Sequence, residues 1–143
     1  EMGSCSVVQV DYSLLNRAVE AEFLPYCLEH NIGVMIRGPL AKGLLAGKYD
    51  KSTVFEDSIR AGWHDGGKAQ AKLENDLDRV EKLKAHASPG TEMVQMALRY
   101  VISQPAVSVV IPGAKSPDQA VANAGAGSEV LSDDLITSLQ SLT

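Results

Sequence analysis

Clustered positive charge, cysteine and long apolar runs are all scarce in this sequence. The two cysteines, Cys5 and Cys27, are too few for a disulfide scaffold and are not spaced as metal ligands. We interpret both as reduced thiols and expect a cytoplasmic protein. No run approaches the roughly 18 apolar residues of a membrane span, and we expect no signal peptide before the apolar run that begins at Val7. The sequence therefore predicts a protein with no membrane partner.

A broad nucleic-acid surface and a metal centre are both disfavoured. The formal net charge is −5 and the lysine and arginine residues form no run, so we expect no nucleic-acid partner. The histidines His30, His64 and His86 share no metal-ligand spacing. No glycine-flanked serine of the hydrolase type is present, and no lysine or aspartate is tied by spacing to any tyrosine. We therefore predict no metal site and no catalytic residue in this chain.

The composition that is present is typical of one globular domain. Apolar residues make up 45% of the chain and charged residues 22%, a balance that supports a core and excludes disorder. A chain of 143 residues is expected to form a single unit over residues 1–143. The acidic residues Glu74, Asp76, Asp78 and Glu81 fit the solvated face of a helix.

Short β-rich runs alternate with helical patterns along the chain. The expected strands are residues 7–10, 34–36 and 107–111. The expected helices are residues 23–30, 73–83, 94–102 and 135–142, and a further helix starts at the capping box of residues 116–119. Thr91 is the expected cap of the helix over residues 94–102. Strands separated by helices predict parallel pairing with right-handed crossovers. The fold class is therefore α/β, with three parallel βα units plus extra helices.

Two further features follow from this order of elements. Residues 38–66 are glycine-rich and show no periodic apolar pattern, so they predict a long loop that is functional or mobile. A parallel sheet of three strands leaves two unpaired edges, and a closed barrel needs about eight strands. We therefore expect oligomerisation to cover the edges.

Positive charges and glycines gather in the loops that follow the three expected strands. The cations are Arg37, Lys42, Lys48 and Lys115, and the glycines are Gly38, Gly43, Gly47 and Gly113. In parallel α/β folds such loops meet at the carboxyl ends of the strands, where ligands bind. Glycines let backbone N–H groups approach an anion, and a capped helix start adds partial positive charge. The pattern suits a ligand with phosphate groups, but spacing alone leaves ordinary solvated loops equally open.

Three ordered segments resemble the C-terminal part of the aldo-keto reductases. Residues 9–17 (QVDYSLLNR) resemble the sixth barrel strand and its exit. Residues 37–49 (RGPLAKGLLAGKY) resemble the loop after the seventh strand, and residues 111–123 (IPGAKSPDQAVAN) resemble the signature of the eighth. The resemblance covers nearly the whole chain and implies a partial TIM (β/α)8 barrel.

The resemblance implies a nicotinamide site, because this family binds NADP(H) across the strand ends and reduces aldehydes and ketones. Gln9 matches the glutamine that bonds the nicotinamide carboxamide. Arg37 matches the position that packs against the nicotinamide ring, as in a bacterial branch of the family. The planar guanidinium of arginine is able to stack on such a ring.

The resemblance also implies contacts to the rest of the cofactor. Gly38, Pro39, Leu40, Lys42 and Gly43 match the loop beneath the pyrophosphate, with Lys48 further along, and Arg60 matches a basic residue that folds over the cofactor. Gly113, Lys115, Ser116 and Gln119 match the pocket for the adenosine 2′-phosphate, and Asn123 matches the contact to adenine. A lysine beside a capped helix start suits a phosphate monoester, so NADP is favoured over NAD. Ala122 departs from the family, whose members often have an acidic residue there.

The same resemblance implies a catalytic part outside this chain. The family's catalytic Asp, Tyr, Lys and His lie on the first four strands, and the tyrosine donates the proton to the carbonyl oxygen. We therefore expect a fragment of a reductase that is inactive alone, with the N-terminal barrel half as a partner. One alternative is a truncated barrel that forms a homo-oligomer by pairing its edge strands across a two-fold axis and binds nucleotides or partners without performing reduction. The other is a non-catalytic structural or interaction module.

Overall fold

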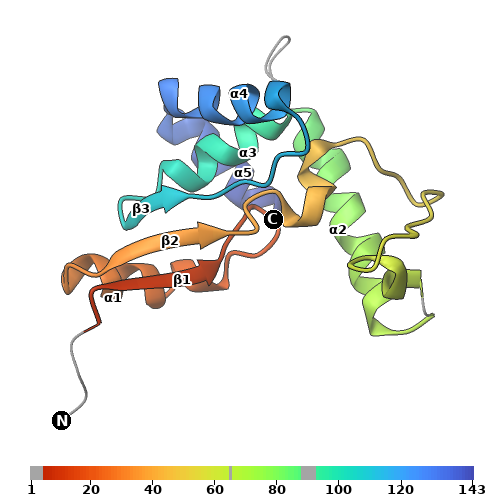
Figure 1. Ribbon diagram of the computed structural model, residues 1–143, viewed down its shortest axis with the longest axis horizontal. Coiled ribbons are helices and arrows are strands. Elements are labelled where there is room, and N and C mark those ends of the chain that lie inside the picture. Colours follow the sequence, from red (N-terminus) through yellow and green to blue (C-terminus); the bar gives the residue numbers. More distant parts are fainter. Residues whose placement is uncertain (1–4, 65, 88–92) are drawn as a thin grey trace.

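The structure is a computed structural model that describes residues 5–64, 66–87 and 93–143. Its regular elements are β1 (Val7–Asp11), α1 (Phe23–Glu29), β2 (Gly33–Arg37), α2 (Lys68–Lys84), α3 (Met93–Ile102), β3 (Val107–Val110), α4 (Pro117–Gly125) and α5 (Asp133–Leu142) (Figure 1). Short 3-10 turns occur at Ala18–Glu20, Ala41–Ala46, Ala61–His64 and Ala126–Ser128. The predicted helix cap at Thr91 lies outside the described residues.

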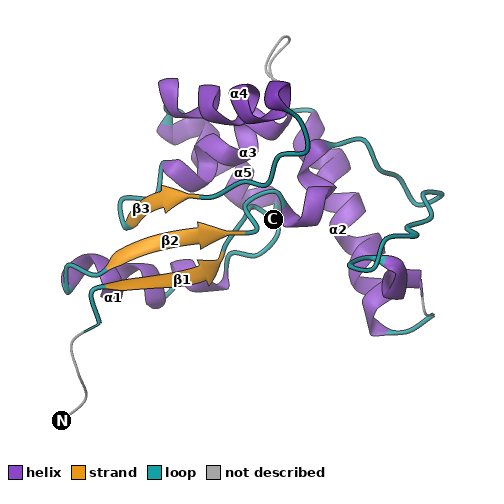
Figure 2. Cartoon of the chain, in the orientation of Figure 1, coloured by secondary structure: helices purple, strands orange, loops and turns teal. Residues whose placement is uncertain are grey.

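The three strands form one parallel sheet in the order β1, β2, β3 (Figure 2). Residues 7–11 pair one to one with residues 33–37. The register between β2 and β3 shifts between Val34 and Met35, where the Ser108 hydroxyl accepts the Val34 N–H at 3.1 Å. The predicted parallel α/β arrangement is confirmed. The carboxyl ends of all three strands therefore lie together at one end of the sheet.

One face of the sheet is buried and the other is open. Val34 and Ile36 of β2 are fully buried in the core, against which α1 and α3 also pack. Residues alternate between the two faces along a strand, so Met35 lies on the opposite face. On that open face Val7 is 60% exposed and Val109 is 43% exposed. The helices therefore cover a single face of the sheet.

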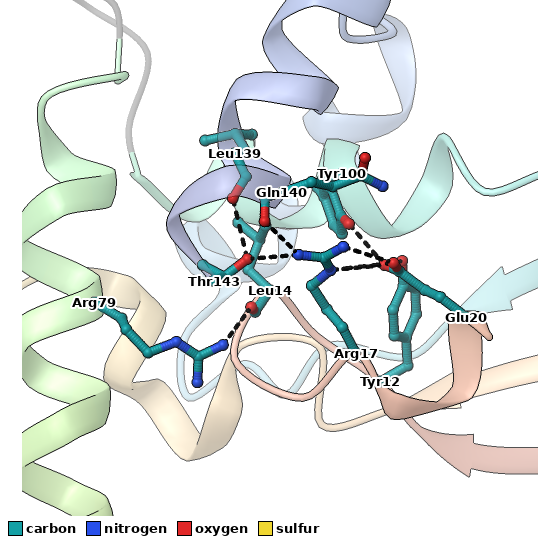
Figure 3. Close-up of polar contacts among 9 residues, drawn as sticks. All are labelled: Tyr12, Leu14, Arg17, Glu20, Arg79, Tyr100, Leu139, Gln140 and Thr143. Carbon is teal, nitrogen blue, oxygen red and sulfur yellow. Dashed lines mark hydrogen bonds and ion pairs between the residues drawn. The ribbon is translucent and has the colours of Figure 1, made fainter.

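The carboxylate of Glu20 joins the exit of β1 to two helices (Figure 3). The hydroxyls of Tyr12 and Tyr100 both donate to Glu20 Oε1, at 2.7 and 2.6 Å. The Arg17 guanidinium donates to Glu20 Oε2 through Nε at 3.1 Å and Nη2 at 3.0 Å. Arg17 Nη1 continues to the carbonyl of Gln140 at 2.8 Å, near the end of α5. These residues, with Glu20 at their centre, are called the Glu20 cluster below.

Burial and hydrogen bonding shift the pKa values in the Glu20 cluster in opposite directions. Burial, followed by the bond to Glu20, raises the pKa of Tyr100 to about 12. The same two causes raise the pKa of Tyr12. Burial opposes ionisation of Glu20, but the hydrogen bonds from Arg17, Tyr100 and Tyr12 outweigh it and lower the pKa of that carboxyl group. The cluster therefore holds one carboxylate and two neutral phenols.

The acidic face predicted for α2 is wrong at one position. Glu74, Asp78 and Glu81 are exposed as expected, but Asp76 is buried. Its carboxylate pairs with Lys72 and, at 3.1 Å, with Nη1 of Arg79. Arg79 also donates to the carbonyl of Leu14 (Figure 3) and to that of Leu15. Asp76 is therefore buried because α2 packs on the segment that follows β1, and its charge is compensated there.

The long loop predicted over residues 38–66 is more ordered than its composition indicated. Two of the short 3-10 turns lie within it. Leu44, Leu45 and Phe55 are buried in the core and anchor the segment at three points. Leu44 and Leu45 are adjacent and Phe55 lies much further along the chain, so these anchors give no helical or strand period in the sequence.

Two classes of feature are absent from the part of the chain that the structure describes, and both cysteines are free. No described helix combines the length and apolar character that a bilayer crossing requires. No group of three or more metal-ligating side chains occurs among the described residues. Cys5 is an exposed free thiol and Cys27 is a buried one.

The substitution Glu20→Gln tests whether the Glu20 cluster stabilises the fold. Loss of the carboxylate leaves Arg17 without its counter-ion, and we expect the free energy of unfolding to fall by about 2–4 kcal/mol at neutral pH. Folding lowers the pKa of Glu20, so its carboxylate stabilises the folded state fully at pH values above the unfolded-state pKa of about 4.3. This stabilisation is lost as the pH falls through the lower pKa of the folded state. Urea denaturation across this pH range measures both effects.

The control for this experiment is Glu22→Gln, at an exposed position two residues away. It removes the same charge and is expected to change the unfolding free energy by less than about 0.5 kcal/mol. Equal unfolding midpoints for the two variants at neutral pH would contradict the role given to Glu20.

Candidate cofactor-binding site

The carboxyl ends of β1 and β2 carry an exposed ion pair. Asp11 and Arg37 are the last residues of these strands and are paired in the sheet register. Arg37 Nη1 lies 3.1 Å from Asp11 Oδ2, and the Arg37 side chain is 58% exposed. Asn16 Nδ2 donates to Asp11 Oδ1 at 3.2 Å from the turn that follows β1. The predicted nicotinamide-stacking arginine therefore lies at the strand ends with its guanidinium held by a carboxylate.

Gly38 turns the chain sharply away from the end of β2. Its φ of 66° lies in the left-handed region that side chains disfavour. A Cβ atom at this position would lie 2.9 Å from Asp11 Oδ2. Both the backbone angle and the close carboxylate require glycine here. The turn directs Pro39 and Leu40 into the loop that was predicted to lie beneath a pyrophosphate.

Gln9 lies on the open face of the sheet, two residue pairs before the Asp11–Arg37 pair in the strand register. Its amide Nε2 approaches the sulfur of Met35 at 3.4 Å, and the side chain is exposed. A thioether is a weak acceptor, so the amide of Gln9 is only weakly engaged by the protein. Gln9 is the middle residue of β1, and its amide is exposed on the open face.

The loop after β2 contains three consecutive residues in the left-handed conformation. They are Ala41, Lys42 and Gly43, with φ values of 48°, 54° and 94°. For the two residues with side chains this conformation costs about 1–2 kcal/mol each. Burial of Leu44 and Leu45 immediately afterwards helps to hold the strained turn in place. Such strain is frequent where a backbone is shaped to meet a ligand.

The two lysines of this loop lie over aromatic rings. Lys42 Nζ is 5.6 Å from the centre of the Trp63 ring, and Lys48 Nζ is 5.2 Å from the centre of the Tyr49 ring. Both distances are within the range of a cation–π interaction. Both lysines are exposed, so their ammonium groups remain accessible to an anion.

Arg60 connects the loop after β2 to the segment before α2. Its guanidinium donates from Nη1 to the Tyr49 hydroxyl at 2.9 Å and from Nε to Asp57 Oδ2 at 2.7 Å. It also lies over the ring of Phe55, 4.6 Å from the ring centre. A Cβ on Gly43 would lie 3.8 Å from Arg60 Nη1, so the two predicted residues are neighbours. Arg60 is thus held in place by the protein itself.

Tyr49 is the clearest feature of this region that the sequence did not reveal. The hydrogen bond from Arg60 is the largest cause that lowers the pKa of its phenol, and the charges of Arg60 and Lys48 add to it. Tyr49 and Arg60 are eleven positions apart, a spacing with no regular structural meaning. Only the fold brings them together, and no local signal could have indicated the pair.

The turn after β3 is fastened to the first turn of α4. The Ser116 hydroxyl accepts the N–H of Gln119 at 3.2 Å, and Pro117 occupies the first helical position, as the capping box predicted. The Gln119 side chain accepts the N–H of Lys115 at 2.8 Å, one residue earlier than the usual reciprocal bond. Asn123 Nδ2 donates to the carbonyl of Gly113 at 3.3 Å.

These bonds leave the Lys115 side chain exposed beside the start of α4. Its ammonium has no ion-pair partner among the residues that the structure describes. A helix N-terminus carries partial positive charge, and the lysine adds a full one. The Lys115 ammonium and the start of α4 therefore present positive charge at the end of β3, beside the exposed carboxylate of Asp118 in the first turn of that helix. They lie at the same end of the sheet as Arg37.

A groove of about 430 Å³ lies between β3, α3 and α4. Its walls are mainly apolar and include Leu98, Ile102, Val110, Ala120 and Ala124. Of the predicted cofactor residues, Asn123 also contributes to this groove. The groove follows the outer edge of β3 and was not expected from the sequence.

The sequence profile of the aldo/keto reductase family matches residues 3–143. The chain belongs to this family. Its structure is correspondingly a partial (β/α)8 barrel with three parallel strands.

Individual proteins agree with this assignment. A probable voltage-gated potassium channel subunit beta from Oryza sativa is 39% identical over 120 residues, which cover 82% of this chain and 37% of that protein. A glycerol dehydrogenase from Gluconobacter oxydans superposes with a TM-score of 0.80 at 27% identity, covering 95% of this chain and 41% of the other.

A third relative was solved with a nicotinamide cofactor. It is an aldo/keto reductase from Klebsiella pneumoniae in complex with NADP and acetate, with a TM-score of 0.62 and 30% identity. The superposition covers 96% of this chain and 39% of that one. The chain thus spans about two fifths of the length of the relatives that it matches.

The substitution Gly38→Ala tests the geometry at the end of β2. The new methyl group would meet the Asp11 carboxylate while the backbone stays in the left-handed region, so we expect a loss of about 1–3 kcal/mol in unfolding free energy. Gly62→Ala is the matched control, because a Cβ there has no atom within 4 Å. Chemical denaturation of both variants measures the difference, and equal stability would show that Gly38 is not required for this turn.

Proposed function

We propose that this chain carries the phosphate-binding surface and part of the nicotinamide-binding surface of an NADP(H)-dependent carbonyl reductase. The observation that carries the proposal is the turn after β3, where an exposed lysine lies beside a capped helix start. Family membership supports it, as does the relative solved with NADP. A phosphate monoester bound there would gain charge-assisted hydrogen bonds from Lys115 and from the backbone of α4.

The remaining predicted residues have separate roles in this proposal. Gln9 would contact the carboxamide, Arg37 would pack against the nicotinamide ring and Asn123 would meet the adenine. The turn formed by Gly38, Pro39, Leu40, Lys42 and Gly43 would support the pyrophosphate, with Lys48 and Arg60 alongside. Bound NADP(H) supplies the hydride chemistry, while these residues bind and orient it.

The proposal assigns proton transfer to a part of the barrel that this chain does not span. In the family, that part supplies the Asp, Tyr, Lys and His that act on the carbonyl group. The N-terminal barrel half is then the partner that completes the enzyme, and the chain alone would bind cofactor without reducing carbonyls. A cytoplasmic location belongs to the same proposal.

The substitution Lys115→Gln tests the 2′-phosphate contact. Loss of one charge-assisted hydrogen bond is expected to weaken NADPH binding about 10- to 100-fold. NADH lacks the 2′-phosphate, so its affinity should change little. Titrations followed by cofactor fluorescence measure both values.

The control is Lys82→Gln, which removes the same charge from an exposed position on α2. It should leave both affinities unchanged. An equal loss for NADPH and NADH in Lys115→Gln would contradict the phosphate contact. The absence of saturable NADPH binding to the unmodified chain would overturn the proposed function itself.

The edges of the sheet favour a second candidate function, that of an assembling module. We propose that β1 of a second copy docks beside β3, head to tail. Ile111 donates its N–H to Ile36 of β2, so by strand alternation Val110 directs its N–H and carbonyl toward the free edge. Val8 and Val10 of the docked β1 would lie on the helix side of the sheet, where the apolar groove is open.

The exposure of α4 supports this docking of β1 beside β3. None of its nine residues is buried, although Ala120 and Ala124 face the groove. An added strand would cover both alanines and continue the parallel order of the sheet. Pairing across a two-fold axis would instead bring identical edges together in antiparallel orientation.

The substitution Ala124→Glu tests this assembly. A carboxylate in the apolar groove should shift the chain from an oligomer to a monomer in sedimentation velocity. Val121→Glu is the control on the same helix, because Val121 is 73% exposed and does not line the groove. If the unmodified chain is a monomer at every concentration, pairing between copies is excluded. The N-terminal barrel half then remains as the partner that pairs with the free edge of β3.

A further inference from the structure

We propose that Asp11 is a positioning residue whose charge allows the oxidised, positively charged nicotinamide ring to bind beside Arg37. This inference rests on the proposed function, in which Arg37 packs against that ring. Oxidised nicotinamide is a pyridinium cation, whereas the reduced ring is neutral. An unpaired guanidinium at this position would therefore repel one form of the cofactor and not the other.

The charges at the strand ends are arranged to cancel this repulsion. Asp11 Oδ2 lies 3.1 Å from Arg37 Nη1, so the pair presents little net charge to a ring above it. The neighbouring side chains on the open face, Gln9, Met35 and Val109, are uncharged. Asp11 is thus the group that sets the net charge around Arg37 on this face.

The Asp11 carboxylate is held by two side chains and lies in a space that Gly38 leaves open. Asn16 donates to Oδ1 at 3.2 Å, Arg37 lies at Oδ2, and the missing side chain of Gly38 leaves room for the carboxylate close to the backbone. Asn16 also donates to the backbone carbonyl of Asp11 at 3.3 Å. A fixed carboxylate holds the guanidinium in one orientation, which a flexible arginine alone would not keep.

The test compares the affinities of the chain for NADP⁺ and NADPH in the Asp11→Asn variant. The asparagine keeps the size of the side chain and an oxygen for Asn16 but removes the charge. We expect NADP⁺ to bind about three- to tenfold more weakly relative to NADPH, a modest value because the ion pair is partly exposed to water. Calorimetric titration with each cofactor form measures the ratio of dissociation constants.

Two further variants separate the charge effect from structural damage. The double variant Asp11→Asn/Arg37→Gln removes both charges and should return the ratio toward that of the unmodified chain. Glu29→Gln removes one negative charge from an exposed position on α1, which packs on the buried side of the sheet, and should leave the ratio unchanged. A defect in folding or in the shape of the site would weaken both cofactor forms together.

The outcomes distinguish this inference from the proposed function. If the unmodified chain binds NADPH but Asp11→Asn leaves the ratio unchanged, the role of Asp11 is overturned and the proposed function stands. If the ratio changes and the double variant does not restore it, charge compensation is overturned. If the unmodified chain binds neither cofactor form, the proposed function and this inference fall together.

Discussion

The hydrogen bonds of the Glu20 carboxylate are the interactions on which the packing of β1, α3 and α5 most depends. It binds Tyr12 at the exit of β1, Tyr100 in α3 and Arg17, whose guanidinium reaches the last turn of α5. Two fully buried phenols and one cation converge on a single side chain, so each partner limits where the others lie. The cluster fixes how the segment after β1 leaves the sheet, and that segment supplies the residues around Asp11.

The candidate site combines rigid support with exposed charge. The strand ends and the buried leucines of the loop after β2 hold its backbone, while Arg37, Lys42 and Lys115 extend into solvent. Aromatic rings lie beside Lys42 and Lys48 and limit their freedom without neutralising them. Positive groups arranged in this way are available to an anion at low entropic cost.

Local patterns in the sequence predicted the elements and failed where distant segments meet. The β-rich runs and the proline and serine that start α4 act through neighbouring residues, so they could be recognised. The turn at Gly38 could also be recognised, but its close approach to Asp11 could not. Burial of Asp76 depends on Arg79 reaching the segment after β1, and the pairing of Tyr49 with Arg60 depends on the path of a loop. The family resemblance supplied the candidate site residues, whereas their spacing alone left solvated loops equally open.

The Arg17–Gln140 bond has a consequence for the order of folding. It joins residues 123 positions apart, while the contact between Gln9 and Met35 across β1 and β2 spans 26. Closing the longer loop costs more chain entropy, and distant contacts form after nearer ones have shortened the path between them. The strand pair and its connecting helix are therefore expected to nucleate the sheet, with α5 docking as a late step that locks the earlier structure.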